Sequence, residues 1–167
     1  EEMKNGRMTI TSNGHEEMGK DVAGVFLLNI GFNQKLIEPI GNIIGNHLAG
    51  VHISHINEWK SKTKFVKKLS RKLTPATIQQ LIHVMEADTN GRGAYWFKDP
   101  IGAKDIMDIG SELVIMTKEY DYILMGRHLI EAGLKPSIKF GAILKQAQEA
   151  QENGEFSDIE GAKRWLH

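Results

Sequence analysis

The sequence predicts an all-α fold made of two packed helical lobes. Apolar residues recur at helical spacing in nearly every segment, and capping or turn residues separate the segments. No segment shows the sustained apolar–polar alternation of a strand. The turn-rich stretch TNGRGAYWFKDP marks the expected boundary between an amino-terminal lobe, residues 1–92, and a smaller carboxy-terminal lobe, residues 93–167.

In the first lobe, the turn Asn13-Gly14 precedes the first expected helix, and Gly31 ends it. Asn33 is expected to cap the second helix. Thr74-Pro75 predicts a helix start, with Thr as N-cap and Pro at the first helical position. The expected helices cover residues 15–28, 33–47, 59–73 and 75–88, with a loop at 49–58.

In the second lobe, a long helix is expected over residues 100–118 and a short one over 125–132. The next helix, 138–153, ends at Gly154, which suits a left-handed C-terminal cap. Ser157 and Glu160 have the spacing of a capping box and predict the start of the last helix.

Composition narrows the class of protein. Of 167 residues, 41% are hydrophobic and 25% are charged, which is ordinary for a globular domain. Lys plus Arg equal Asp plus Glu, at 21 each, so the chain is not a uniformly cationic nucleic-acid binder, although local patches are compatible with this balance. The absence of cysteine excludes disulfides and thiolate sites and fits the expected cytoplasmic location. No signal peptide or membrane-length apolar run is visible, so no membrane partner is expected.

The stretch NGHEEMGKDVAG begins like a zinc-protease helix, but the second metal histidine is missing because Gly19 occupies its position. His47, His52 and His55 have spacings at which imidazoles can share a metal, although histidine-rich loops also occur without one. Asp88 ends an amphipathic helix, where it either serves a buried site or shapes the following turn.

The run WKSKTKFVKKLSRK is basic and contains no acid. It is either a solvated helix face or a surface that contacts nucleic-acid phosphates. Helical spacing places five of its cations on one face, with Lys62 and Lys72 off that stripe. The predicted phosphate-binding residues of this helix are Lys60, Lys64, Lys67, Lys68 and Arg71.

Several catalytic motifs are absent from the sequence. There is no Walker-type phosphate loop and no Gly-x-Ser-x-Gly elbow. Gly110-Ser111 is not followed by Asp-x-Asp, so no nucleotidyltransferase metal centre is encoded in this chain.

Three segments, GHEEMGKDVAGVFL, IIGNHL and LIHVMEADTNGRG, resemble HD-superfamily domains after their His-Asp dyad. The carboxy-terminal segment ILMGRHLIEAGLKPSIKFGAILKQAQEAQENGEFSDIEGAKRWL is similar to the tail of bacterial tRNA nucleotidyltransferases and poly(A) polymerases that carry an HD domain. Together these matches span about residues 14 to 166.

The resemblance implies that the chain is the second half of an HD domain plus a tail that positions RNA. The matching metal positions are His15, His47 and Asp88. Because no histidine precedes His15, the dyad is missing, and we expect a divalent-metal site that is empty and a chain that is not catalytic by itself. The chain begins with Glu1, and an upstream head that uses Mg²⁺ or Mn²⁺ would transfer nucleotides from CTP or ATP.

The expected partners are RNA, above all tRNA, nucleotide through the head, and a second copy of the chain as a homodimer. Arg92 and Arg127 join the expected RNA contacts. Two alternatives stay open: a metal-dependent HD phosphohydrolase acting on nucleotides, and a non-catalytic helical interaction module. The sequence does not decide between CCA and poly(A) addition.

Overall fold

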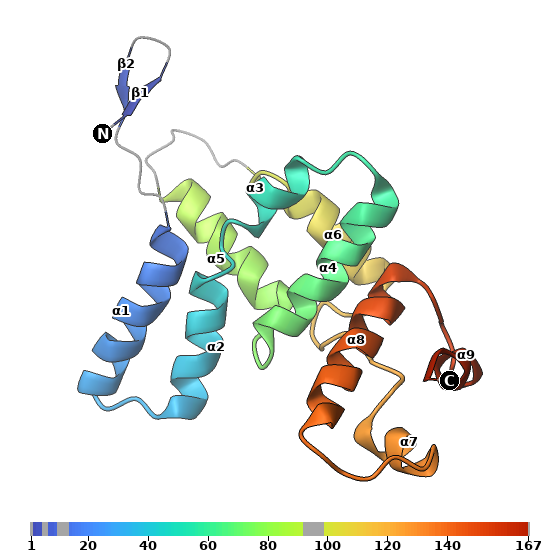
Figure 1. The fold of residues 1–167 in the computed structure, drawn as a ribbon. Helices are drawn as coiled ribbons and strands as arrows, with labels where there is room; N and C mark the ends of the chain where they lie inside the picture. Colours follow the sequence, from blue (N-terminus) through green and yellow to red (C-terminus); the bar gives the residue numbers. More distant parts are fainter. Residues whose placement is uncertain (1, 5–6, 10–13, 92–98, 167) are drawn as a thin grey trace.

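The computed structural model describes residues 2–4, 7–9, 14–91 and 99–166. Within these ranges the regular secondary structure is helical except for a small antiparallel hairpin near the amino terminus (Figure 1), so the all-α prediction is confirmed. The hairpin strands are β1 (Glu2–Lys4) and β2 (Arg7–Thr9). They were not predicted, because strands of three residues are too short to show alternation.

The helices follow one another through short connections. Their bounds are α1 His15–Asn29, α2 Gln34–Ile44, α3 Ala49–Ser54, α4 Trp59–Leu73, α5 Ile78–Asn90, α6 Ala103–Glu112, α7 Gly126–Glu131, α8 Lys139–Asn153 and α9 Ile159–Leu166.

Several of the expected helix ends are correct. Helix α4 has the predicted bounds, because its apolar residues keep helical spacing between turn signals. The Asn33 side chain caps α2 by accepting a hydrogen bond from the Leu36 N–H at 3.3 Å. Gly154 ends α8 with φ of 80°, a left-handed conformation that glycine adopts without steric cost.

Other expectations are wrong in their details. Helix α5 is capped by Thr77, which forms a capping box with Gln80, and not by Thr74. Asp158, not Ser157, accepts the Gly161 N–H at the start of α9. The loop expected at residues 49–58 contains α3, and the helix expected over 100–118 is confined to α6. At the starts of α5 and α9, several Ser, Thr and Asp residues lie close together, and each of them can serve as the N-cap.

Apolar side chains form two core clusters. The first joins α3, α4, α5 and α6, and Leu73, Leu81 and Ile106 lie fully buried in it. The second joins the segment before α7 with α7, α8 and α9, and Leu129 is at its centre. The members of the first cluster extend to Tyr120, and those of the second begin at Ile123.

The expected lobe boundary, between residues 92 and 93, falls in the segment outside the described residues and stays a prediction. Helix α6 follows that segment, yet it packs on α4 and α5 in the first cluster. The contact between α3 and the start of α6 needs glycine on both sides. A Cβ on Gly50 would overlap the Ile101 carbonyl oxygen, and one on Gly102 would overlap the Gly50 carbonyl oxygen.

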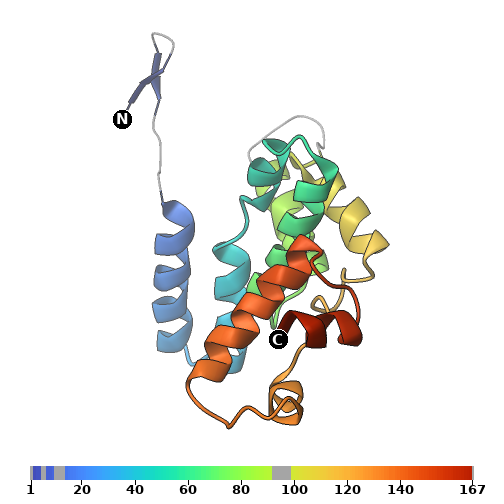
Figure 2. The ribbon, with the colours of Figure 1, turned by 45° about the vertical axis from the view of Figure 1, so that its right-hand side comes forward.

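Helix α1 lies at one edge of the molecule beside α2 (Figure 2). None of its residues is buried. Its apolar side chains, among them Met18, Val22 and Phe26, are exposed. Of the described helices, α2 is its principal partner, through close contacts such as that of Gly19 with the Ile44 side chain.

Candidate functional site

His15 and His47 come together although they are 32 residues apart in sequence. His15 is the first residue of α1, and His47 lies in the turn after α2. Their Nε2 atoms are 3.1 Å apart, and the rings meet edge to face with centroids 5.0 Å apart. The packing of α1 along α2 positions this pair, since both residues lie at the same end of the two helices.

The hydrogen bonds of the pair indicate which ring nitrogens carry a hydrogen. The His47 Nδ1 lies 2.6 Å from the Ile44 carbonyl oxygen, which can only accept a hydrogen bond. His47 Nδ1 therefore carries the proton, and in the neutral ring Nε2 is an acceptor. His15 Nε2–H then donates to His47 Nε2. Placing a proton on both Nε2 atoms would replace this bond with repulsion.

The same geometry suits two ligands of one divalent ion. Imidazole nitrogens bind zinc at about 2.0–2.1 Å, so two such ligands lie roughly 3–3.5 Å apart. The bond from His47 Nδ1 to a carbonyl is also what commonly orients a metal-binding histidine. Two of the three residues that were expected to converge, His15 and His47, therefore lie next to each other.

The third predicted ligand, Asp88, is exposed near the end of α5. Across the described ranges, no group of three or more His, Cys, Asp or Glu side chains could hold a metal ion. His15, His47 and Asp88 therefore do not form a three-ligand site in this structure. Nor do His47, His52 and His55 form such a site in the described part of the chain.

A small cavity of about 120 Å³ opens beside the histidine pair. Helices α1, α3 and α4 and the turn after α2 contribute its walls. Its polar lining consists of Glu16, Asn46, His52, Lys68 and Lys72. Leu48, Ala49, Phe65 and Leu69 supply an apolar surface.

The cations of α4 divide into two groups. The first group faces protein partners. Lys62 forms an ion pair with Asp105 at 2.6 Å, and the Lys67 ammonium lies 4.9 Å from the centre of the Tyr120 ring. Arg71 turns toward α8, where its Nη1 donates to the Gln148 Oε1 at 3.0 Å.

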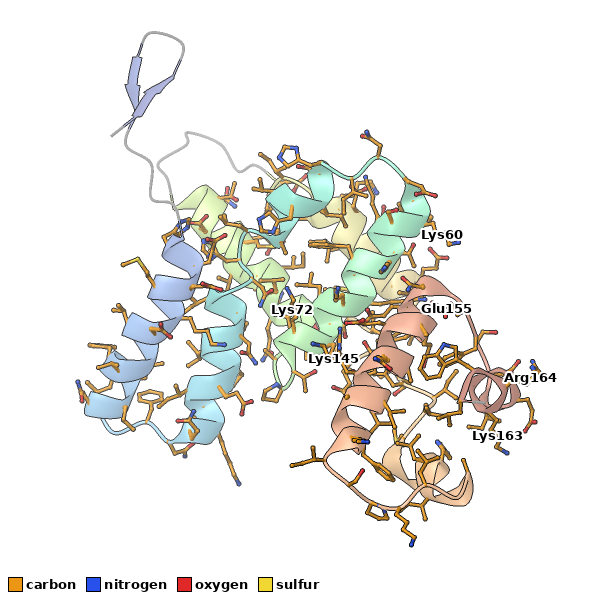
Figure 3. The ribbon with its side chains drawn as sticks, viewed as in Figure 1. Lys60, Lys72, Lys145, Glu155, Lys163 and Arg164 are labelled. Atoms are coloured by element: carbon orange, nitrogen blue, oxygen red, sulfur yellow. The ribbon has the colours of Figure 1, made fainter. Side chains whose placement is uncertain are left out.

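The second group forms the α4 ridge, defined as Lys60, Lys64, Lys68 and Lys72. Steps of four residues keep successive members next to each other on the helix surface, and the row winds about 120° around the axis from Lys60 to Lys72. Within the described part of the chain, none of the four forms an ion pair. Figure 3 shows Lys60 and Lys72 toward opposite ends of α4, with Lys145 on the adjoining α8. Lys72, which was expected to lie off the stripe, is included in the ridge because it continues the four-residue spacing.

The remaining predicted RNA contacts lie elsewhere. Arg127 is exposed on α7, and its Nε donates to the His128 Nε2 at 3.2 Å. Arg92 lies outside the described residues. Neither residue is part of the α4 ridge.

A buried polar cluster connects α4 with α8 and was not predicted. Glu152 is buried, and its Oε1 accepts from the Tyr122 hydroxyl at 2.7 Å and pairs with Arg71 Nη2 at 3.3 Å. Glu152 Oε2 and Arg71 Nε are buried and have no hydrogen-bond partner among the described residues. Burial and the hydrogen bond to Glu152 raise the pKa of Tyr122 far above its ordinary value.

Gln151 is a second buried polar residue of α8. Its amide donates to the Asp121 carbonyl, and its Oε1 accepts from the Ile123 N–H. Its spacing in the sequence could have predicted its burial, because Gln151 follows Ala147 and Ala150 on the buried face of α8. A polar side chain on such a face has to find a partner.

No helix in the described ranges combines the length and apolar character needed to cross a membrane. A scan against models of known protein families, a search of curated proteins and a search of solved structures found no match.

Proposed function

We propose that this chain binds and positions RNA, as the resemblance to the carboxy-terminal part of tRNA nucleotidyltransferases implies. The observation that carries the proposal is the α4 ridge, because its lysines have no carboxylate partner in the described part of the chain. From Lys60 to Lys72 the ridge extends about 18 Å, at about 1.5 Å per helical residue. That length suits contact with several phosphates of one RNA strand.

The surroundings of the ridge support the same function. The helix itself contains no Asp or Glu, and the carboxylates that pair with it from other helices, Asp105 and Glu152, bind Lys62 and Arg71 and not the ridge. Lys145 is exposed one turn before Gln148, the α8 residue that bonds Arg71, and it extends the cationic surface beyond α4. Lys62, Lys67 and Arg71 contribute less in this proposal, because they already have protein partners.

Charge reversal tests the proposal. Lys60→Glu with Lys64→Glu should weaken tRNA binding about tenfold or more at low salt, measured by fluorescence anisotropy. Lys35→Glu with Lys139→Glu is the matched control, because both lysines are exposed and lie outside α4. Equal losses in the two double variants, or no loss in either, would remove the RNA role from the ridge. Lys62 is unsuitable as a control because it pairs with Asp105.

A second candidate function is the metal-dependent phosphohydrolase. The convergence of the His15 and His47 Nε2 atoms favours it, since two imidazoles are already placed to share an ion. Further ligands would have to come from substrate, water or residues beyond these two. Titration with Mn²⁺ should broaden the imidazole resonances of His15 and His47 before those of His52 and His55. Uniform broadening would argue against this candidate.

A further inference from the structure

The cavity beside the histidine pair lies at the carboxyl end of the α4 ridge. Lys68 and Lys72 belong to the ridge and also line the cavity. They are one helical turn apart, so both side chains leave α4 on the same side. His52 of α3 lines the same space and adds a third nitrogen-bearing side chain.

The charges around this cavity are unbalanced. Within the described ranges neither lysine has a carboxylate within ion-pair distance. The two lysines carry like charges at one cavity, and part of its remaining lining, including Phe65 and Leu69, is apolar. An apolar wall lowers the local dielectric constant and strengthens both the repulsion and the attraction for an anion. A bound anion would relieve the repulsion.

Glu16 opposes the binding of an anion in this cavity. Its side chain lines the cavity from α1, and its carboxylate disfavours an anion there. Asn46 also lines the cavity, and its Nδ2 donates to the Asn42 carbonyl at 2.8 Å, which leaves Oδ1 to face other groups. A ligand that carries a hydroxyl next to its anionic group could donate to Glu16 or Asn46 while the lysines hold the anion.

The size of the cavity limits the ligand. Its volume of about 120 Å³ corresponds to roughly four water molecules at about 30 Å³ each. Sites that enclose drug-sized ligands measure about 300–1,000 Å³, so this cavity does not enclose a whole nucleotide, and the rest of a larger ligand would lie outside its mouth. One phosphate group does.

We propose that this cavity binds a single phosphate group through Lys68 and Lys72, with His52 at its edge. The group is either the terminal phosphate of an RNA or a free phosphomonoester. The site goes beyond the proposed RNA binding along α4, because it recognises one phosphate in a cavity rather than a series of phosphates on a surface.

The first test uses inorganic phosphate as the probe and chloride at equal ionic strength as the reference. Phosphate should raise the thermal midpoint of the parent protein, because a ligand of the native state stabilises it. Lys68→Gln with Lys72→Gln should weaken phosphate binding about tenfold or more, since two charged hydrogen-bond donors are lost. Lys60→Gln with Lys64→Gln removes the same charge from the same helix and should leave phosphate binding unchanged.

Two results would overturn the proposal. One is a parent protein that responds equally to phosphate and chloride. The other is a Lys68/Lys72 double variant that keeps the parent's response. If that variant does not fold, Glu16→Gln provides a second test, in which phosphate binding should become tighter and not weaker. Loss of its negative charge should tighten phosphate binding about two- to fivefold, whereas Glu17→Gln, which lies outside the lining, should not; equal effects would contradict the site.

A final comparison separates the two sources of phosphate. A short RNA with a terminal phosphate should compete with inorganic phosphate better than the same RNA with hydroxyl ends if the ligand is an RNA end. Equal competition assigns the cavity to small phosphomonoesters. RNA binding by the Lys60/Lys64 variants tests only the ridge, whereas phosphate binding by the Lys68/Lys72 variant tests only the cavity. The two proposals can therefore fail separately.

Discussion

Helices α1 and α4 each contain 15 residues, and both carry apolar residues at helical spacing, yet they have different environments. Helix α4 buries Val66, Leu69 and Leu73 in the first core cluster and turns its lysine ridge outward. Helix α1 buries no residue, and Val22 is 67% exposed. Apolar residues at helical spacing therefore do not by themselves show that a helix is buried, because the neighbouring helices decide whether those residues are covered.

The two helices also differ in the partners of their charged and polar side chains. On α4 a cation can serve the fold, as Arg71 does with Glu152, or remain available to a ligand, as Lys60 and Lys64 do. On α1 the polar residues His15 and Lys20 reach the neighbouring segment, where Lys20 bonds Asn42 of α2 and His15 meets His47 in the turn after α2. The four predictions below test this difference.

The largest effect is expected from Arg71→Ala. It should lower the free energy of unfolding by about 3–5 kcal/mol, because it leaves a buried carboxylate without its cation. Glu152 is that carboxylate, and its side chain is 0% exposed. Urea denaturation measures the change. Lys104→Ala removes an exposed pair with Asp108 and should leave the midpoint unchanged; a similar small effect for Arg71 would show that the cluster does not hold α4 to α8.

Truncation of one apolar side chain on each helix compares their packing directly. Leu73→Ala should cost about 2–5 kcal/mol of unfolding free energy, because a fully buried side chain leaves a cavity. Val22→Ala on α1 should change it by less than about 0.5 kcal/mol. Urea unfolding of the two variants under identical conditions gives both values. If Val22→Ala were as costly as Leu73→Ala, the apolar face of α1 would be covered in solution.

A smaller effect is expected at alkaline pH. Burial, and then the hydrogen bond to Glu152, raise the pKa of Tyr122, so the folded protein keeps a phenol proton that the unfolded chain loses above about pH 10. The stability from this group is complete below about pH 10 and is lost as the pH rises further. Tyr122→Phe should therefore flatten the alkaline decline in the unfolding midpoint. Parallel declines in the variant and the parent would show that Tyr122 is accessible.

Local patterns in the sequence predicted much of the fold. The bounds of α4, the Asn33 cap and the Gly154 cap follow from residues within a few positions of one another. The caps at Thr77 and Asp158 were assigned to the wrong residue, because several polar residues compete near each helix start. Two short strands and the short helix α3 give no periodic signal of sufficient length.

The candidate site was predicted only in part, for a different reason. His15 and His47 were matched by a resemblance, and the packing of α1 on α2 brings them together. Arg71 was expected to contact RNA, but Gln148, 77 residues away, is its hydrogen-bond partner. The sequence of α4 alone contains no information about that partner. The same limit applies to the cavity, whose walls come from three helices and a turn.

The salt dependence of RNA binding tests most directly whether the outer face of α4 acts through phosphates. Fluorescence anisotropy with tRNA would give the slope of log affinity against log salt for the parent and for the Lys60→Gln, Lys64→Gln double variant. Each phosphate contact contributes about 0.7–0.9 to that slope, so the loss of two contacts should make the variant's slope smaller by roughly 1.4–1.8. The loss should be the same for unrelated RNA sequences, because phosphate contacts carry no base information. Equal slopes and equal affinities for the two proteins would contradict the account.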